Sequence, residues 1–475
     1  MAANVMVVNL IPKSLSGESN PDSEPNLAVN PANPQVIAAS AFTPNPAGAG
    51  DAPIYLSTDG GNTWSLQAIV PSDQMTADIT LRFATSSNSL YAGIIRTPIV
   101  SNTPRLNILR TNNVLSGSPM DVLVDRTGQG VDQPYIQAAT APDGKGGQVD
   151  VVVCGDNDFN HQPQSATMDV SANAGVTPAP FSNKVVDVRP PAGGDAPSIR
   201  PAIHSDGTVY GAFLRRVAGT TNSNLRYDVV VVRDDGFGNG SPAFAALNDP
   251  SDGLVGTRVA QNRLIPFLNQ TVFGQERIGS TLTIGVDPRG GQSGTLFVAW
   301  ADRVGKTDYT IHLVKSVDRG KTWSKADLLT ITNATNPAVA INDNGVVGFV
   351  YQQLTGPFKP NHVSAANRWV THFQISRDGG TTWGDLILAT TPANVPPNSP
   401  PNVMLPYLGD YLHLMAIGND FYGVFSANNT PDPANFPNGV VFQRNHSMSS
   451  KTLLDVDGVT PVDVSIDPFF FKVTL

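Results

Sequence analysis

A short apolar segment that ends in a turn recurs along the whole chain, and it constrains the fold more than any other feature. Its clearest copies are Pro25-Asn-Leu-Ala-Val-Asn-Pro31, Leu282-Thr-Ile-Gly-Val-Asp-Pro288 and Pro337-Ala-Val-Ala-Ile-Asn-Asp343. Four weaker copies begin at Ile79, Pro134, Pro197 and Pro406. The copies are spaced about 54 to 85 residues apart, so each repeat unit has room for four short strands.

Short β-branched runs such as Gln148–Val153 and Thr295–Trp300 fill the units, and Gly, Pro, Asn or Asp bounds each run. This pattern is typical of many short strands and not of helices. Seven units of four strands predict an all-β fold, a seven-bladed β-propeller of four-stranded antiparallel blades, with six blades as the alternative. We expect residues 1–475 to form this single domain, with segment 1–20 contributing a closing strand because a ring must hide its edges.

A second repeat has the spacing Ser-x-Asp-x-Gly-x-Thr-Trp and occurs at residues 57–64, 316–323 and 376–383. Its Asp can cap the backbone of a turn, its Gly supplies an unusual φ, and its Trp packs into the blade. It resembles the Asp-box, the repeat of sialidases and several related propeller families, and the resemblance places it between the third and fourth strands. The residues to which we assign this structural role are Asp59, Trp64, Asp318, Trp323, Asp378 and Trp383.

In such a blade the innermost strand starts at the face that carries the central funnel. The loop that enters this strand and the loop between the second and third strands both lie on that face. Two of the three glutamates of the chain fall in entering loops. The entering loops carry Glu24, Asp78, Asp132, Asp195 and Glu276, and the second-to-third loops carry Arg96, Asp156, Arg215, Arg216, Asp302, Arg303 and Tyr351.

Three neighbouring units place Arg82, Gln137 and Arg200 at a position where the other units have Ala or Gly. Guanidinium groups can hold a carboxylate bidentately, so these side chains predict a polar sector that binds an anion. The resemblance to sialidases implies three arginines around a sugar carboxylate, the third being Arg277, Arg215 or Arg303. The alternative is that Arg82 and Arg200 form structural bridges with aspartates of the entering loops. The expected substrate-binding residues are Arg82, Gln137, Arg200, Arg215 and Arg277.

The same resemblance implies a tyrosine nucleophile made reactive by a glutamate, together with an aspartic acid as proton donor; other glycosidases use two carboxyl groups. The tyrosine could be Tyr351, Tyr407 or Tyr411. The candidate catalytic residues are Glu24, Asp78, Glu276, Asp302 and Tyr351.

Composition limits the partners. A formal charge of −9 argues against a nucleic-acid partner, and no apolar stretch is long enough to predict membrane insertion. The single cysteine, Cys154, excludes a disulfide framework within the chain. We expect no required cofactor, with a structural calcium ion on the axis as the one metal considered. The N-terminal residues do not resemble a signal peptide, and we expect export by another route in preference to a cytoplasmic location.

Function has to be argued from the site, because one ring architecture serves many functions. The first hypothesis is an exo-acting, sialidase-like glycoside hydrolase with an acidic or neutral glycan in the central funnel. The second is a non-catalytic module that recognises a glycan or a protein on the same face. The third is a scaffold that binds protein partners through its rim loops.

Overall fold

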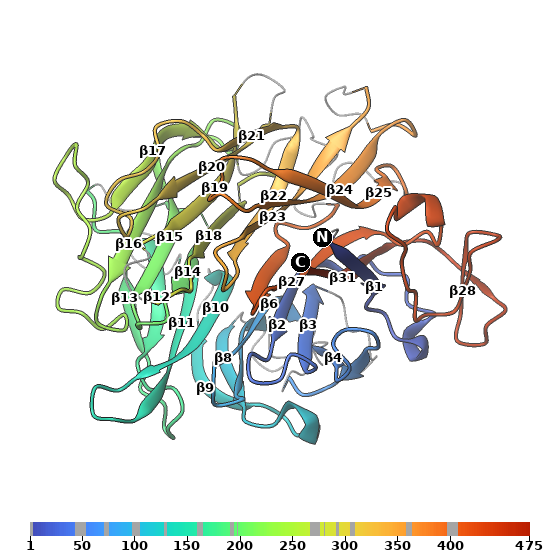
Figure 1. Cartoon of the computed structure of the whole chain (residues 1–475), viewed down its shortest axis with the longest axis horizontal. Coiled ribbons are helices and arrows are strands. Elements are labelled where there is room, and N and C mark those ends of the chain that lie inside the picture. Colours follow the sequence, from blue (N-terminus) through green and yellow to red (C-terminus); the bar gives the residue numbers. More distant parts are fainter. Residues whose placement is uncertain are drawn as a thin grey trace.

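Seven four-stranded antiparallel sheets surround a common axis in the computed structural model of the chain (Figure 1). The innermost strands are neighbours in the cyclic order β2, β6, β10, β14, β18, β22, β26 and again β2, which closes the ring. The predicted seven-bladed propeller is therefore confirmed. The structure describes residues 3–42, 54–70, 76–96, 105–127, 131–158, 165–190, 194–196, 198–266, 276–279, 281–290, 294–304, 309–357, 363–396 and 407–475.

The first three blades each consist of four consecutive strands, ordered from the axis outwards. Blade 1 comprises β2 (Ser23–Val29), β3 (Ile37–Phe42), β4 (Ile54–Ser57) and β5 (Ser65–Gln67); blade 2 comprises β6 (Thr76–Phe83), β7 (Leu90–Arg96), β8 (Arg105–Thr111) and β9 (Asp121–Thr127); blade 3 comprises β10 (Val131–Pro142), β11 (Gln148–Asp158), β12 (Ser165–Ser171) and β13 (Ser182–Val185).

The next three blades repeat this order. Blade 4 comprises β14 (Arg200–Ile203), β15 (Val209–Ala218), β16 (Arg226–Asp234) and β17 (Thr257–Leu264); blade 5 comprises β18 (Leu282–Val286), β19 (Leu296–Arg303), β20 (Tyr309–Ser316) and β21 (Leu329–Thr332); blade 6 comprises β22 (Ala334–Ile341), β23 (Val347–Thr355), β24 (Arg368–Ser376) and β25 (Gly384–Pro392).

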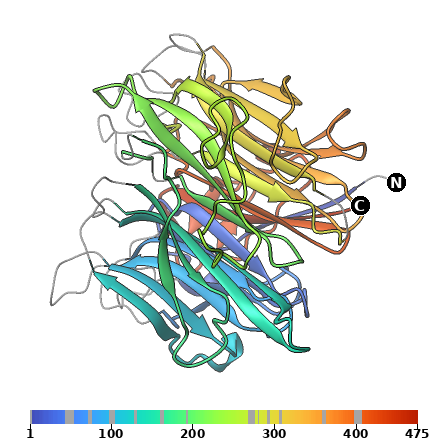
Figure 2. The ribbon, with the colours of Figure 1, turned by 90° about the vertical axis from the view of Figure 1, so that its left-hand side faces the viewer.

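Blade 7 combines both ends of the chain in the order β26 (His413–Ile417), β27 (Asp420–Asn428), β31 (Ile466–Thr474) and β1 (Asn4–Asn9). β1 pairs antiparallel with β31 from Asn4–Thr474 to Asn9–Phe469, so the N-terminal segment supplies the outermost strand. Both chain ends consequently lie at the same edge of the ring (Figure 2). This pairing also hides the edge that β31 would otherwise expose.

The innermost strand of blade 7 begins later than the sequence repeat indicated. The weak copy at Pro406 predicts the strand there, but the strand is His413–Ile417. Residues 407–412 instead form the loop that enters it, and they bring Asp410 and Tyr411 to the axis. The repeat misplaced this strand because a glycine-containing apolar loop has the same residue pattern as a small-residue inner strand.

A smaller three-stranded sheet branches from blade 7 between β27 and β31. It consists of β28 (His446–Ser447), β29 (Thr452–Leu454) and β30 (Pro461–Val462). The described residues include three short 3-10 helices, at Lys13–Leu15, Val114–Ser116 and Pro433–Asn435. Within the part of the chain that the structure describes, no helix has the length and apolar character needed to cross a membrane.

The core lies where neighbouring blades face each other. Trp300 of blade 5 and Phe349 of blade 6 are almost fully buried in one cluster that extends from blade 4 to the start of β31 in blade 7. Phe471 and Phe425 of blade 7 pack in a second cluster together with Phe373 of blade 6. Burying such side chains contributes about 1.5–3 kcal/mol each, which stabilises every blade against its neighbours.

Each of the three Ser-x-Asp-x-Gly-x-Thr-Trp segments connects the third and fourth strands of its blade. Asp59 accepts hydrogen bonds from the backbone N–H of Thr63 at 2.9 Å and from its hydroxyl at 2.6 Å. Asp318 and Asp378 make the same pair of contacts with the threonine four residues later. Trp64 is 5% exposed, and Trp323 and Trp383 pack against the core. These contacts hold a turn together.

Candidate functional site

The innermost strands of blades 1, 3 and 6 start with a β-bulge that turns a polar side chain towards the axis. Glu24, Gln133 and Asn336 occupy these bulges with φ of 55°, 44° and 53°. A proline follows each of them in the sequence. Such φ values are uncommon outside glycine, and bulges often aim side chains next to functional sites. The ring thus presents a set of polar groups where its innermost strands begin.

We call the polar residues that meet there the axial cluster. Its members come from the strand starts or entering loops of six blades, all except blade 6. They are Glu24, Asp78, Asp132, Gln133, Arg200, Arg277, Asp410 and Tyr411.

Asp410 lies at the centre of this cluster and is fully buried. The guanidinium group of Arg277 donates to both carboxylate oxygens of Asp410, from Nε to Oδ1 at 2.5 Å and from Nη2 to Oδ2. Gln133 donates to the same carboxylate at 2.8 Å. Burial lowers the pKa of Arg277, but the Asp410 carboxylate outweighs it and raises that pKa overall. The pair of N–H donors with which Arg277 could hold a ligand carboxylate is therefore already bound to a carboxylate of the protein.

Glu24 and Asp78 form a hydrogen-bonded carboxyl pair, and each residue is only 7% exposed. Burial, reinforced by the charges of Asp78 and Asp410, raises the pKa of Glu24 well above its usual value. Burial also raises the pKa of Asp78, although hydrogen bonds from Glu24 and Tyr411 counteract it. Two carboxyl groups this close cannot both ionise readily, so the pair holds a proton at neutral pH.

Tyr411 and Asp132 complete the acid–base groups. The Tyr411 hydroxyl donates to Asp78 Oδ1 at 3.0 Å. Burial, with the charges of Asp78 and Asp410, raises the pKa of Asp132 to about 7. A carboxyl with such a pKa can give or take a proton near neutral pH.

Arg200 faces aromatic rings on this axis. Its guanidinium carbon lies 4.4 Å from the centroid of the Tyr135 ring and 5.5 Å from that of Tyr411. It also donates to Gln133 Oε1 at 3.3 Å. Burial, with the charges of Asp78 and Glu24, raises the pKa of Tyr411 well above its usual value, and the charge of Arg200 acts against this shift.

Arg82 has different surroundings. Its Nη2 donates to Nε2 of His413 at 2.9 Å, and Nη1 lies 3.4 Å from the sulfur of Met415. Burial and the nearby arginines lower the pKa of His413 well below its usual value, so the ring is neutral and accepts this bond. Arg82, Arg200 and Arg277 are thus each turned towards a group of the protein.

A small hollow opens beside the cluster and contains about 230 Å³ of space, its mouth included. Arg200, Tyr411 and Asp410 contribute polar atoms to its wall. Most of this space is open to solvent, and its enclosed part has room for about one water molecule. The remaining described lining residues are Tyr135, Thr281, Leu282, Thr283, Asn336, Pro337 and Leu412.

Other predicted catalytic residues have partners elsewhere in the described structure. Glu276 accepts a hydrogen bond from the backbone N–H of Leu408, and burial raises its pKa well above the usual value. Asp302 accepts from His312 at 3.0 Å inside blade 5. Tyr351 stacks on His372 in blade 6, with ring centroids 4.9 Å apart. We leave Asp302 and Tyr351 out of the axial cluster, because these are contacts between adjacent strands of one blade.

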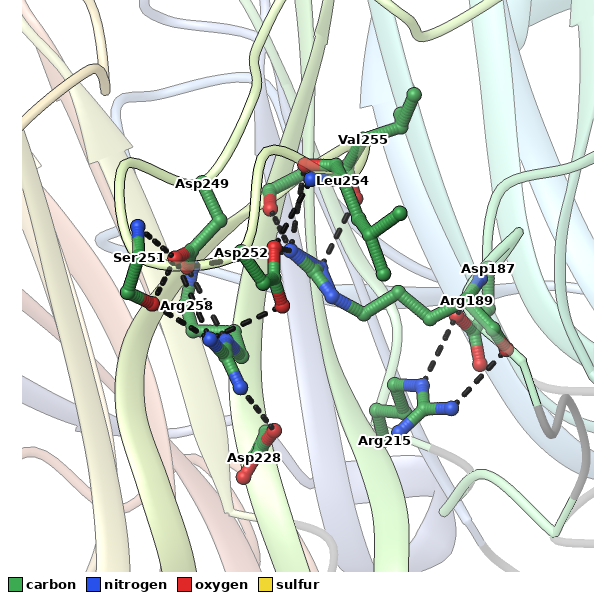
Figure 3. A network of polar contacts seen from close by, with 11 residues as sticks. Asp187, Arg189, Arg215, Asp228, Asp249, Ser251, Asp252, Leu254, Val255 and Arg258 are labelled. Carbon is green, nitrogen blue, oxygen red and sulfur yellow. Dashed lines mark hydrogen bonds and ion pairs between the residues drawn. The ribbon is translucent and has the colours of Figure 1, made fainter.

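Arg215 belongs to a buried network between blades 3 and 4 (Figure 3). Its Nε donates to Asp187 at 3.3 Å, and Nη2 donates to the carbonyl of Arg189 at 3.0 Å. Arg189 in turn reaches the carbonyl groups of residues 254–256. Both of these contacts of Arg215, which was predicted to bind substrate, are with groups of the protein. Asp195, another entering-loop carboxylate, is bonded to Asp187 in the same region.

Sequence reasoning missed two members of the cluster, Gln133 and Asp410. Gln133, and not Gln137, supplies the amide of blade 3 that reaches Asp410; Gln137 is half-buried further along β10. A polar residue followed by proline at the start of an inner strand is the signal that marks Glu24, Gln133 and Asn336. Asp410 has no such signal. Among the described residues, the axial carboxylates do not form a group of three able to meet on one ion.

No protein-family model matches the chain, and no curated protein matches it. Among solved structures, an α-L-arabinanase of Penicillium chrysogenum aligns with a TM-score of 0.45 and 14% identity, over 74% of this chain and 94% of that one. The Hadza microbial sialidase Hz136 aligns at 0.42 and 13%, over 88% and 66%. The WD40 domain of SCAP from fission yeast aligns at 0.36 and 9%, over 99% and 98%. These similarities are too distant for any activity to be carried over.

Proposed function

We propose that the chain is a glycoside hydrolase that acts on a glycan bound at the axial cluster. The observation that carries this proposal is the hydrogen bond from the Tyr411 hydroxyl to Asp78 at 3.0 Å, beside a carboxyl that holds a proton near neutral pH. Tyr411 as nucleophile, Asp78 as base and Asp132 as acid then lie near one another. This is the set that a two-step displacement at a sugar requires.

In the first step, the Tyr411 oxygen attacks the anomeric carbon while its proton passes to Asp78. Asp132 donates its proton to the oxygen of the leaving group, and the glycosidic bond breaks. Arg200, 5.5 Å from the ring of Tyr411, stabilises the negative charge that develops on the phenol. In the second step, Asp132 takes a proton from water and the water oxygen attacks the anomeric carbon. The bond between that carbon and the Tyr411 oxygen breaks, and Asp78 returns its proton to Tyr411.

The glycan that fits this arrangement is neutral. A sugar carboxylate would need guanidinium groups turned towards it. Arg277 is instead hydrogen-bonded to Asp410, and Arg82 is hydrogen-bonded to His413. A sialoside would therefore have to displace a buried ion pair, at a cost of several kcal/mol. This argues for neutral sugars ahead of sialic acid.

The test is hydrolysis of a panel of 4-methylumbelliferyl glycosides, with neutral furanosides and pyranosides beside the sialoside. We expect turnover of a neutral member and a fall of about 10³-fold or more in kcat for Tyr411→Phe. Asp132→Asn should lose about 10²- to 10⁴-fold on poor leaving groups and recover with 2,4-dinitrophenyl glycosides, which need no acid. The matched control is Tyr407→Phe, a buried tyrosine whose hydroxyl donates to the carbonyl of Val395.

A second candidate is a non-catalytic glycan-binding module. The shape of the hollow favours it, because the enclosed part has room for about one water molecule and a sugar would therefore contact the cluster with one edge only. Binding of a neutral glycan without turnover, weakened in the Arg200→Ala variant, would support this candidate over the hydrolase.

A further inference from the structure

A second group of carboxylates lies where the ring closes, between blade 1 and blade 7. Glu18 and Asp22 come from the segment that leads into β2, and Asp467 comes from β31. One oxygen of each lies within 4.8 Å of the others. Two oxygens on opposite sides of a Ca²⁺ ion are about 4.6–5.2 Å apart, so this spacing can surround one ion.

The group is buried and acidic. Asp22 and Asp467 are fully buried, and Glu18 is half-buried. Arg444, also fully buried, donates to Asp467 at 2.9 Å. Keeping acidic side chains out of water costs several kcal/mol for each ionised group, and a bound divalent cation would offset this cost.

Two buried polar atoms in this region have no hydrogen-bond partner among the described residues. One is the second carboxylate oxygen of Glu18, and the other is the hydroxyl of Tyr55 on β4. Tyr55 is fully buried, and Asp22, Glu18 and Asp467 are among the charged groups near its hydroxyl. The hydroxyl therefore lies beside the carboxylate group. Orphaned buried polar atoms are rare and indicate a missing ligand or water.

Asp467 is the fixed member of the group. Its oxygens accept hydrogen bonds from Asn9 and Asn429, both at 2.7 Å, as well as from Arg444. Asp22 is held through its backbone, which donates to the carbonyl of Ile466 at 2.7 Å. The group is thus preorganised by β31 and by the N-terminal segment, which pack on each other in the last blade.

We propose that Glu18, Asp22 and Asp467 bind a structural divalent cation at the closure of the ring, with Ca²⁺ as the matching ion. All three ligands are hard oxygen donors, which Ca²⁺ prefers and which soft metals do not require. The Tyr55 hydroxyl contacts the ion through a bound water. The cation ties the segment before β2 to the strand that completes blade 7, so it stabilises the closed ring independently of any activity on the axis.

The test begins with full-length protein freed of metal by EDTA and dialysis. Addition of CaCl₂ should raise the melting temperature by about 2–5 °C through binding to the folded state alone. Tb³⁺, which replaces Ca²⁺ and emits when a nearby aromatic ring is excited, should give sensitised emission that Ca²⁺ displaces. Tyr55→Phe should reduce this emission, and Glu18→Gln should weaken Tb³⁺ binding at least tenfold. The matched control is Asp457→Asn, at an exposed aspartate between β29 and β30 of the three-stranded sheet.

Two results would overturn the proposal. One is metal-free protein whose melting temperature and Tb³⁺ emission do not respond to Ca²⁺. The other is Glu18→Gln protein that is more stable than wild type in both Ca²⁺ and EDTA, because the group would then be held by protons and not by metal. If Glu18→Gln does not fold, the wild-type titration and the Tyr55→Phe variant decide the question.

Discussion

Asp132 offers a sharp test of the electrostatics of the axial cluster through the substitution Asp132→Asn. Its pKa moves from 3.8 to about 7 because of burial and of the charges of Asp78 and Asp410. At about 1.4 kcal/mol for each tenfold change in proton affinity, this amounts to about 4 kcal/mol. The folded protein binds this proton more tightly than the unfolded chain does. The stability that this proton contributes is therefore fully present below about pH 4 and is lost as the pH rises towards 7.

Asparagine has the shape of aspartic acid but does not ionise, so the variant escapes this loss. The free energy of unfolding of Asp132→Asn minus that of wild type should increase by up to about 4 kcal/mol between pH 4 and pH 7.5, and then stay constant. Guanidinium chloride titrations at half-unit pH steps measure it. Asp143→Asn is the control: backbone hydrogen bonds from Lys145 and Gly147 lower the pKa of this exposed aspartate, so its difference should stay nearly constant from pH 4 to pH 7.5 and change only below about pH 4. A difference for Asp132→Asn that does not vary with pH would refute the reasoning.

Two further predictions concern stability. Asp234 accepts hydrogen bonds from the backbone N–H groups of Gly236 at 2.7 Å and Phe244 at 2.9 Å, among others. Asp234→Ala should therefore lower the free energy of unfolding, measured by chemical denaturation, by about 3–5 kcal/mol. The neighbouring substitution Asp235→Ala should lower it by under about 1 kcal/mol. A Cβ at Gly423 would lie 2.3 Å from the Phe471 ring, so Gly423→Ala should lower the free energy of unfolding by about 2–4 kcal/mol. A Cβ at Gly290 meets nothing within 4 Å, so Gly290→Ala should change the free energy of unfolding little. Equal effects in either pair would contradict the packing described here.

The ring could be predicted from the sequence because its determinants are local. Inner strands of small and β-branched residues, and turns capped by Asp59, Asp318 and Asp378, depend on contacts between residues close in the chain. The strand that begins blade 7 was misplaced because Gly409 gives a loop the pattern of a strand. Its conformation depends instead on Glu24, with which a side chain at position 409 would collide.

The site was only partly accessible to sequence reasoning. Glu24, Asp78 and Asp132 were found because their place at strand starts fixes the face on which they lie. The Arg277–Asp410 pair joins residues 133 positions apart and depends on how the ring closes. Arg82 and Arg200 were placed near the axis, but their partners follow from side-chain geometry that no repeat encodes.

The Tyr411–Asp78 contact is the basis of the proposed hydrolase, and covalent trapping tests it most directly. The protein would be incubated with a 2-deoxy-2-fluoro glycosyl fluoride of the neutral sugar that it turns over, then digested and mapped by mass spectrometry. The account predicts one added sugar per chain, on the peptide that contains Tyr411, and no label in Tyr411→Phe. A label on another residue, or turnover of the parent glycoside by Tyr411→Phe at the wild-type rate, would contradict it.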